Sequence, residues 1–337
     1  MSAPQNRRWV LIKRPIGMVQ RTDFEFSNAP AGAPGPGEVL LRVLYLSLDP
    51  AMRGWMNESK SYIPPVGLGE VMRAIGLGRV VASNDPSVRP GELATGLTGV
   101  QDYSVIASKN LNKVDPNLAP LPRYLGALGG TGLTAYFGLL EVGQPKPGET
   151  VVVSGAAGAT GSIVGQIAKI LGCRAVGIAG GAAKCKYLTE ELGFDAAIDY
   201  KGEDVRAELS RHCPNGVNVF FDNVGGEILD VVLAQLARKA RVVLCGAISQ
   251  YNNAADVRGP KNYLSLLINS ARMEGFIVFN YAQRYGEGVQ SLAAWLAEGK
   301  IKAREDIIAG LENFPEAFLK LFRGENFGKL LIKVAED

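Results

Sequence analysis

The sequence has very little histidine and cysteine, and this scarcity excludes several kinds of chemistry. One of its 337 residues is a histidine, His212, and the four cysteines lie apart with no C-x-x-C pair: Cys173, Cys185, Cys213 and Cys245. A catalytic zinc needs about three His, Cys or carboxylate ligands, and a structural zinc needs four soft ligands at close spacing. Neither set can be assembled, and a serine–histidine triad would have to use His212, which ends a polar helical segment. We therefore expect no metal site and no acyl-transfer catalysis.

Long apolar runs and an excess of one charge are also missing. The 36 Lys and Arg against 33 Asp and Glu give a formal net charge of +3, and no long basic run occurs, so nucleic acid is not an expected partner. No stretch reaches the length of a membrane-spanning helix, and MSAPQNRRW at the start has no apolar signal-peptide core. We expect no membrane association and a cytoplasmic location. The hydrophobic content of 47% and the 41 glycines describe a globular, turn-rich chain, long enough for two domains.

One segment that is present is typical of nucleotide binding. Residues 151–171, VVVSGAAGATGSIVGQIAKIL, join an apolar β-branched run, a cluster of small residues and a segment with helical period. Gly155, Gly158 and Gly161 recur every third residue, so the backbone can bend after the strand and approach a pyrophosphate closely. The N-terminus of the helix would then face the anion. Tight packing at a strand-to-helix turn produces the same spacing, so the glycines alone leave both interpretations open.

The residues that follow favour NADP(H) over NAD(H). Residues 174–179 (RAVGIA) predict a second buried strand, which completes a βαβ unit. An NAD site has an Asp or Glu at the end of this strand, whereas here residues 180–183 are Gly and Ala, followed by Lys184 and Lys186. No carboxylate is present to repel a 2′-phosphate, and the two ammonium groups can pair with it, Lys184 being the better candidate. The alternative is that both lysines are ordinary solvated residues at the start of a helix.

The pattern of expected secondary structure changes near residue 121. Before it, short β segments separated by turns predict a small, mostly β domain: residues 7–14, 38–48, 76–82, 92–96 and 100–106. After it, β and α patterns alternate, with strands expected at residues 196–199, 217–221, 241–245 and 276–279. This alternation is typical of a doubly wound parallel sheet, whose ligands lie beyond the carboxyl ends of the strands. The segment 276–279 (FIVF) is apolar enough to be buried or to pair with a second subunit. The last stretch, to about Val334, is expected to fold back onto the β domain.

Eight motifs together resemble a known enzyme family. They are LSLDPAMRGWM (46–56), TGLTAYFGLL (131–140), SGAAGATGSIVGQIAK (154–169), LGFDAAIDYK (192–201), DNVGG (222–226), CGAISQYN (245–252), RMEGFIV (272–278) and NFGKLLIKV (326–334). In this combination the sequence resembles the zinc-independent medium-chain dehydrogenase/reductases. Within that family it resembles the branch of prostaglandin reductases, plant alkenal double-bond reductases and bacterial curcumin reductases. The resemblance covers essentially the whole chain in order.

The resemblance implies a fold and an activity. The fold is α/β, a Rossmann doubly wound parallel sheet plus a mostly β, GroES-like catalytic domain. Residues 1–125 would form the first part of the catalytic domain, residues 126–304 the NADP(H)-binding Rossmann domain, and residues 305–337 the C-terminal part of the catalytic domain. The implied protein is a homodimer that uses NADPH to reduce the C=C bond of α,β-unsaturated aldehydes or ketones.

The resemblance also implies site residues, matched position by position. The cofactor contacts would be Gly158, Ala159, Thr160 and Gly161 at the pyrophosphate, Lys184 and Tyr200 at the 2′-phosphate, and Asn223, Cys245, Gly246, Ala247, Ile248, Ser249, Tyr251, Phe276, Ile277, Val278 and Asn326 elsewhere. Arg53 and Tyr251 match positions at the substrate cleft and are the implied catalytic residues.

The expected mechanism needs few catalytic side chains. Hydride adds to the β-carbon of the enone, and negative charge develops on the carbonyl oxygen as an enolate. A hydroxyl donor held at that oxygen in a dry cleft stabilises the charge and can pass on a proton. Tyr251 fits this role because a phenol stays protonated at neutral pH. The alternative is that Tyr251 only stacks on or hydrogen-bonds the cofactor and that solvent supplies the proton.

Two positions depart from the family pattern. Ala51 stands where many relatives have an aromatic residue, and Ile268 stands where the mammalian prostaglandin reductases have Tyr, so their second hydroxyl is absent unless Tyr263 replaces it. Prostaglandins are therefore not the expected substrates.

Two other functions stay open. The first is a zinc-free NADPH:quinone oxidoreductase. The second is a redox-sensing or structural NADPH-binding protein without turnover.

Overall fold

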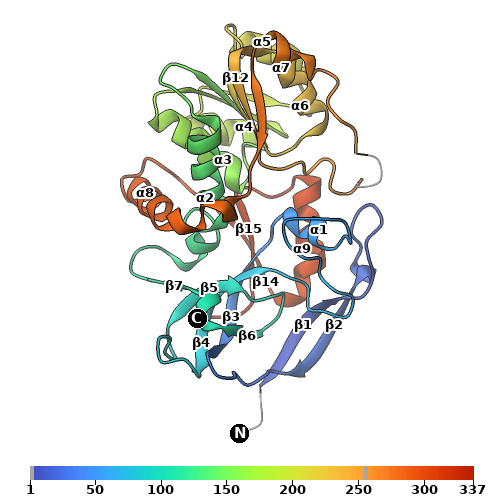
Figure 1. The fold of residues 1–337 in the computed structure, drawn as a ribbon, viewed down its shortest axis with the longest axis vertical. Coiled ribbons are helices and arrows are strands. Elements are labelled where there is room, and N and C mark those ends of the chain that lie inside the picture. Colours follow the sequence, from blue (N-terminus) through green and yellow to red (C-terminus); the bar gives the residue numbers. More distant parts are fainter. Residues whose placement is uncertain (1–3, 254–256) are drawn as a thin grey trace. The chain divides into compact units, whose positions relative to one another are not determined.

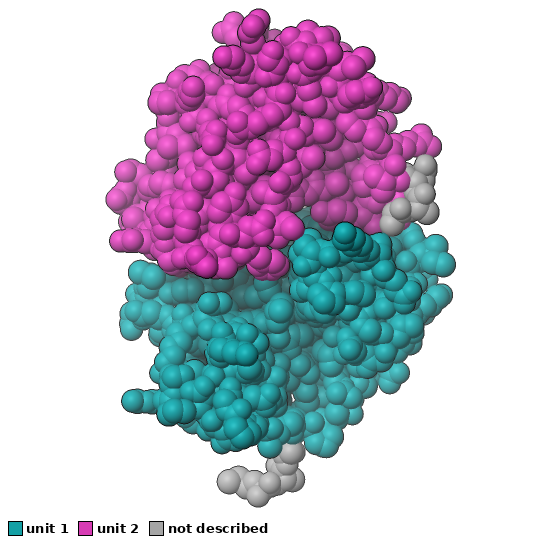
Figure 2. All heavy atoms as spheres, viewed as in Figure 1, with its two compact units in different colours: residues 1–126, 305–337 teal, residues 127–304 magenta. Residues whose placement is uncertain are grey.

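The structure is a computed structural model that describes residues 4–253 and 257–337. The chain divides into two compact units, coloured separately in Figure 2. Unit 1 consists of Met1–Gly126 and Glu305–Asp337, and unit 2 of Ala127–Arg304. Residues 1–3, with which the expected first domain begins, lie outside the described residues. No helix in the described part of the chain is long and apolar enough to cross a membrane.

Unit 1 is built on β-sheet. A seven-stranded sheet has the order β14-β15-β3-β4-β5-β7, with β6 also pairing with β3, and a second sheet consists of β1 and β2 (Figure 1). The strands are β1 (Gln5–Leu11), β2 (Phe24–Pro30), β3 (Glu38–Ser47), β4 (Ile75–Ser83), β5 (Leu93–Leu97), β6 (Tyr103–Ala107), β7 (Asn112–Val114), β14 (Glu305–Ala309) and β15 (Lys329–Lys333); the helices are α1 (Ala51–Trp55) and α9 (Phe314–Arg323).

The two ends of the chain meet in the core of unit 1. β15 pairs antiparallel with β3, with Leu331 opposite Ser47, so the last stretch returns to the N-terminal β segments as the sequence predicts. Trp9 is fully buried against Phe24 and Phe314, and its indole N–H donates to the Leu311 carbonyl at 2.8 Å. Residues more than 300 positions apart thus share one hydrophobic core.

Unit 2 is a parallel sheet with helices packed on it. The six strands have the order β10-β9-β8-β11-β12-β13, which is the order 3-2-1-4-5-6 of a doubly wound nucleotide-binding sheet. The strands are β8 (Thr150–Ser154), β9 (Arg174–Ala179), β10 (Ala196–Asp199), β11 (Val217–Asp222), β12 (Leu236–Leu244) and β13 (Arg272–Gly275); the helices are α2 (Gly130–Phe137), α3 (Ala159–Ile170), α4 (Ala182–Lys186), α5 (Val205–His212), α6 (Gly226–Leu233), α7 (Leu264–Ile268) and α8 (Tyr285–Ala297).

Both faces of this sheet are covered, because successive side chains of a strand point to opposite faces. Phe220 packs in the cluster that contains Leu209 of α5 and Leu233 of α6. Its neighbour Phe221 points the other way, where it meets Gly138 in the π-helical turn after α2 and the ring of Phe276. The fully buried β-branched strands of the sequence therefore belong to a two-sided parallel sheet, as predicted.

The structure corrects the sequence-based prediction at the end of unit 2. The strand predicted at residues 276–279 is wrong, because the strand there is β13, four residues earlier. β13 pairs with β12 from Arg241 opposite Arg272 to Leu244 opposite Gly275, so it ends where its neighbour ends. The apolar residues that follow lie beyond the sheet; residues 276–278 are half-buried, and Phe279 is 50% exposed.

In unit 2 the sequence analysis placed the start of one strand too late and missed one helix. β12 begins at Leu236 rather than at residue 241, and its pairing with β11 shifts register between Val217 and Val219. Helix α6 was not predicted at all, although Leu229, Val232 and Leu233 are buried at the i, i+3, i+4 spacing of a helix.

Candidate functional site

The predicted cofactor residues of unit 2 gather along one edge of its sheet. Because all six strands are parallel, their carboxyl ends share this edge, which is where ligands of such sheets bind. Residues 158–161 follow β8, Lys184 follows β9, Tyr200 follows β10 and Asn223 follows β11. Residues 245–251 follow β12, and residues 276–278 follow β13. Asn326 and Arg53 belong to unit 1.

The turn after β8 has the form that a pyrophosphate requires. Gly155 has a φ of +58°, a left-handed conformation that favours glycine, and its carbonyl accepts the Gly158 N–H at 3.0 Å. A Cβ on Gly161 would lie 2.5 Å from the Gly155 carbonyl oxygen, so only glycine lets α3 approach this closely. Gly158 precedes α3 without a side-chain cap, which leaves the first N–H groups of the helix for an anion.

A buried carboxylate organises the neighbouring strand end. Asp222 is fully buried at the end of β11, and its side chain accepts from the Ser154 hydroxyl at 2.6 Å and from the Val224 and Gly225 N–H groups at 3.0 Å. Burial raises the pKa of Asp222, and these hydrogen bonds act against that rise. The Ser154 hydroxyl also accepts the Asn223 N–H at 2.9 Å, and the Asn223 side chain donates to the Ser154 carbonyl at 2.7 Å.

This network holds Asn223 beside the β8 turn. A Cβ on Gly155 would lie 3.5 Å from that of Asn223. Sequence reasoning missed Ser154 and Asp222, although a polar residue that ends an otherwise apolar strand was a usable signal in both cases.

The loop after β12 brings the Tyr251 hydroxyl back to the strand end. The backbone N–H groups of Cys245 and Gly246 donate to the Asp222 carbonyl at 2.9 and 3.1 Å. The Ala247 N–H donates to the Tyr251 hydroxyl oxygen at 3.1 Å, and a Cβ on Gly246 would lie 3.1 Å from that oxygen. The backbone donor occupies one lone pair of the phenol and polarises its O–H bond for donation elsewhere.

Tyr200 lines the turn at the end of β9, and two lysines follow that turn along the chain. A Cβ on Gly180 would lie 2.9 Å from the ring and the hydroxyl of Tyr200, so this tyrosine packs directly on the turn. Lys184 is half-buried on α4. Lys186 is exposed, and its Nζ lies 3.7 Å from a carboxylate oxygen of Glu190.

The structure corrects the expectation that no carboxylate lies at the end of β9. Asp199 of the adjacent strand accepts the Gly181 N–H at 2.7 Å and the Lys201 N–H at 3.0 Å. These backbone hydrogen bonds lower the pKa of Asp199. The sequence analysis considered only residues that follow β9 along the chain, whereas Asp199 comes from the strand beside it.

Phe276 serves as packing at the end of β13. Its ring lies at 71° to that of Phe221, with 6.3 Å between centroids, and a Cβ on Gly138 would lie 2.3 Å from it. Ile277 and Val278 are half-buried.

Arg53 has structural contacts within unit 1. Its side chain is 2% exposed, and its guanidinium donates to the carbonyls of Pro15 and Gly17 at 3.1 and 3.0 Å and to the Asn57 side chain at 2.6 Å. Burial lowers the pKa of Arg53, against the attraction of Asp23. These bonds attach the loop around Gly17 to α1.

Asn326, the other predicted site residue of unit 1, lies in the loop before β15. It is half-buried, and its side-chain amide donates to the Gly328 carbonyl at 3.1 Å.

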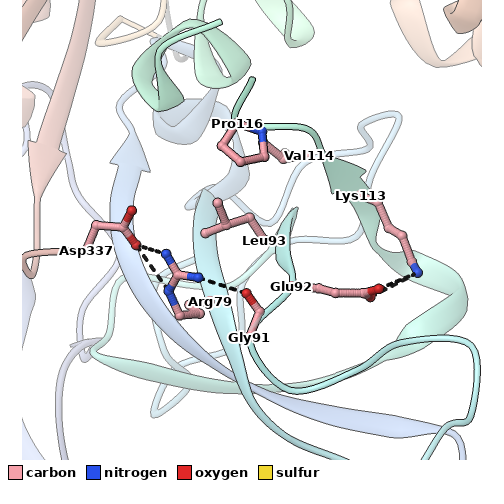
Figure 3. Close-up of a pocket in the computed structure, with 8 residues that line it drawn as sticks. All are labelled: Arg79, Gly91, Glu92, Leu93, Lys113, Val114, Pro116 and Asp337. Atoms are coloured by element: carbon pink, nitrogen blue, oxygen red, sulfur yellow. Dashed lines mark hydrogen bonds and ion pairs between the residues drawn. The ribbon is translucent and has the colours of Figure 1, made fainter. Parts of the chain in front are cut away.

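A pocket of about 320 Å³ lies elsewhere in unit 1 (Figure 3). Its charged groups already pair with one another: Arg79 with Asp337 and the Gly91 carbonyl, and Lys113 with Glu92 at 2.9 Å. The remaining lining residues are Leu93, Val114 and Pro116, and no predicted site residue is among them. Within the described residues, no group of three or more His, Cys, Asp or Glu could hold a metal ion.

Two family models match the chain. The first, described as the N-terminal domain of oxidoreductase, matches residues 7–114, and the second, described as zinc-binding dehydrogenase, matches residues 159–294. Among characterised relatives, the NADPH-dependent curcumin reductase of Escherichia coli (strain K12) is 44% identical over 99% of this chain and 98% of its own. The 2-alkenal reductase (NADP(+)-dependent) of Nicotiana tabacum is 39% identical over 98% of each chain.

A solved structure agrees with these relatives. The crystal structure of CurA from Vibrio vulnificus in complex with NADPH superposes with a TM-score of 0.93 at 44% identity, covering 98% of this chain and all of that one. The chain therefore belongs to the medium-chain dehydrogenase/reductase family, in the zinc-independent branch that contains the curcumin, 2-alkenal and prostaglandin reductases.

Proposed function

We propose that the protein is an NADPH-dependent reductase of the conjugated C=C bond in enals and enones. The observation that carries this proposal is the arrangement at one edge of the unit 2 sheet. There a turn suited to a pyrophosphate follows β8, and the loop that carries the Tyr251 hydroxyl follows β12 of the same parallel sheet. The activities named for the relatives support it, since the curcumin and 2-alkenal reductases both use NADP(H). Unit 2 is accordingly the NADP(H)-binding domain, and unit 1 the catalytic domain.

The residues present fit a dinucleotide. A Cβ on Gly161 would lie 2.5 Å from the Gly155 carbonyl oxygen, so only glycine lets α3 begin this close to the turn that would hold the pyrophosphate. Residues 158–161 would hold the pyrophosphate. Asn223 and residues 245–249 would hold the part of the dinucleotide that lies between the ends of β11 and β12. When bound, NADPH supplies the hydride for the β-carbon of the substrate.

Tyr251 then acts on the opposite end of the conjugated system. Its hydroxyl donates to the substrate carbonyl oxygen, where negative charge develops as the C=C bond is reduced. The Ala247 N–H at 3.1 Å fixes the position of the phenolic oxygen and favours partial negative charge on it. Arg53 holds the loop of residues 15–17 and so shapes unit 1 without being required to touch the substrate.

The product distinguishes this function from the others. NADPH oxidation by the purified protein is measured with a simple trans-2-enone, with a quinone, and with NADH in place of NADPH, and the organic product is identified by NMR. We expect the saturated carbonyl compound, with NADH a poor donor. An allylic alcohol, or consumption of the quinone alone, would exclude the proposed function, and tight NADPH binding with no oxidation would indicate a binding protein.

A Tyr251→Phe variant tests the assigned hydroxyl. Removal of one donor to a developing oxyanion costs about 10²–10³ in kcat in other enzymes, so we expect a fall of at least tenfold in kcat for the enone. Affinity for NADPH should change less than threefold. An unchanged kcat would mean that Tyr251 only orients the cofactor and that solvent supplies the proton.

We also propose a homodimer located in the cytoplasm. β13 is an edge strand of the unit 2 sheet, with its outer row of backbone groups unpaired in the described chain. Leu267 and Ile268 of the preceding helix α7 are each 77% exposed, and Tyr263 beside them is 56% exposed. An open strand edge and exposed apolar side chains are each typical of a surface that a second subunit covers.

A further inference from the structure

A third lysine, Lys201, lies at the turn that ends β9. A Cβ on Gly180 would lie 2.9 Å from the Tyr200 hydroxyl and 3.0 Å from Cε of Lys201. Both side chains leave the end of β10 and fold over the same point of the neighbouring turn. The end of the Lys201 side chain therefore lies against the segment where the ribose of a bound dinucleotide is recognised in sheets of this order.

The Lys201 ammonium is available for an anion. Among the described residues, its Nζ forms no ion pair. The charge of Lys201 contributes to the lowered pKa of Asp199, but the Asp199 carboxylate is hydrogen-bonded to backbone N–H groups. Oδ1 of Asp199 accepts the N–H groups of Gly181 and Lys201, so its charge faces backbone donors at the base of the turn. The nearby Glu203 carboxylate accepts the Asp199 N–H at 2.7 Å.

Lys186 is placed differently. Its side chain is 70% exposed, and its ammonium lies 3.7 Å from Glu190, one helical turn further on. The atoms nearest to a Cβ on Gly180 belong to Tyr200 and Lys201, not to Lys186.

We propose that Lys201, together with Lys184 and Tyr200, forms the 2′-phosphate site, and that Lys201 rather than Lys186 is its second cation. The proposal rests on the proposed function, because it presupposes that unit 2 binds NADP(H). A 2′-phosphate carries close to two negative charges at pH 7, so two ammonium groups and a phenolic donor match it in charge and in hydrogen bonding. The ribose of NAD(H) offers only a neutral hydroxyl at this place and gains little from either lysine.

Calorimetry with NADP⁺ and NAD⁺ tests the assignment without turnover. The two nucleotides differ only in the 2′-phosphate, so the ratio of their Kd values isolates this site. For Lys201→Ala we expect NADP⁺ to bind about tenfold more weakly, which is the scale of one lost hydrogen bond to a charged group at a partly exposed site. NAD⁺ binding should change less than twofold. Lys201→Arg should restore most of the NADP⁺ affinity.

Lys186→Ala is the matched control, because it removes the same charge from the same neighbourhood and should leave both Kd values within twofold. Gly180→Ala is a second probe, since its Cβ would displace the Tyr200 hydroxyl and Lys201 Cε together; it should lower the preference for NADP⁺ by more than Lys201→Ala does. Circular dichroism checks that each variant is folded.

The outcomes separate two kinds of failure. If the wild-type protein prefers NADP⁺ and Lys201→Ala keeps the full preference, Lys201 lies outside the site and this inference is wrong while the proposed function stands. An equal effect of Lys186→Ala would also overturn it. If the wild-type protein binds neither nucleotide or has no preference, the proposed function itself fails.

Discussion

At the scale of single residues, buried polar atoms at the strand ends set the geometry of the site. The Ser154 hydroxyl donates to Asp222 and accepts the Asn223 N–H, so one small side chain joins two strand ends. Both of its partners lie in unit 2 at or near the predicted cofactor edge, and Asp222 has no contact with solvent. A buried polar group that loses its partner is costly, which makes this hydroxyl more important than its size suggests.

Replacement of Ser154 tests this role. Ser154→Ala leaves the buried Asp222 with one donor fewer and removes the acceptor of the Asn223 N–H, so we expect a loss of about 1–3 kcal/mol in the free energy of unfolding. NADP⁺ affinity should fall as well, because Asn223 is no longer held. Urea denaturation and calorimetry measure the two effects. Ser210→Ala on the exposed side of α5 is the control, expected within about 0.5 kcal/mol of wild type.

Cys245 provides a second prediction at this scale. Burial raises the pKa of its thiol to about 12, so almost none of it is thiolate at neutral pH. Since the thiolate is the nucleophile, we expect Cys245 to react slowly with electrophiles, a useful property beside a site for electrophilic enals. Intact-protein and peptide mass spectrometry after N-ethylmaleimide treatment at pH 7.5 should find Cys245 unmodified in the folded protein and modified in urea. Rapid labelling of the folded protein at Cys245 would contradict this.

Asp85 provides the prediction for pH. Its carboxylate accepts from the Ser108 hydroxyl and from the hydroxyl and N–H of Ser87, which lowers the pKa of Asp85 to about 2. A carboxyl whose pKa is lower in the folded than in the unfolded state stabilises the fold above the unfolded value near 3.8 and loses this effect as the pH falls towards 2. Wild type should therefore exceed Asp85→Asn in stability at pH 6, and the difference should shrink below pH 4. A constant difference from pH 6 to pH 2.5 would exclude the mechanism.

At the scale of elements, the β8–α3 unit depends on backbone contact. A Cβ on Gly161 would lie 2.5 Å from the Gly155 carbonyl oxygen and 2.9 Å from Cα of Ala156, so main chain packs on main chain. These atoms cannot move aside as the end of a flexible side chain can. The position of α3 relative to β8 is thus set by the absence of one methyl group.

Gly161→Ala should therefore disturb both stability and binding. We expect a loss of about 1–3 kcal/mol in the free energy of unfolding, as for other overpacked sites, and NADP⁺ binding at least tenfold weaker because the pyrophosphate turn shifts. Gly286→Ala in α8 is the matched control, since a Cβ there meets nothing within 4 Å; it should be neutral or slightly stabilising. Wild-type NADP⁺ affinity in Gly161→Ala would show that the turn does not hold the cofactor.

At the scale of the whole molecule, the open edge of the unit 2 sheet argues for association of two chains. Light scattering should give a mass near twice the 35.9 kDa of the chain. A double variant, Leu267→Asp with Ile268→Asp, places charge on the most exposed apolar positions of α7 and should yield folded monomers. A monomeric wild type would refute the dimer, and a dimeric double variant would exclude this surface as its interface.

The sequence by itself determined the order and type of most elements in unit 2. The strands predicted at residues 174–179 and 196–199 coincide with β9 and β10, because a buried parallel strand is a continuous apolar run between turn residues. The parallel alternation then placed the predicted cofactor residues at strand ends before any contact was known. In unit 1, the long apolar run of residues 38–48 likewise identified β3.

The tertiary structure alone decided which of these strand ends face one another. The register of β12 and β13 placed residues 276–279 beyond the sheet, and the pairing of β9 with β10 brought Asp199 and Lys201 to the Gly180 turn. The Tyr251 hydroxyl reached the Ala247 N–H through a loop whose course no periodicity describes. Hydrophobic periodicity records which face of an element is buried, whereas the partner on that face depends on strand order and register, which arise only when distant segments pack together.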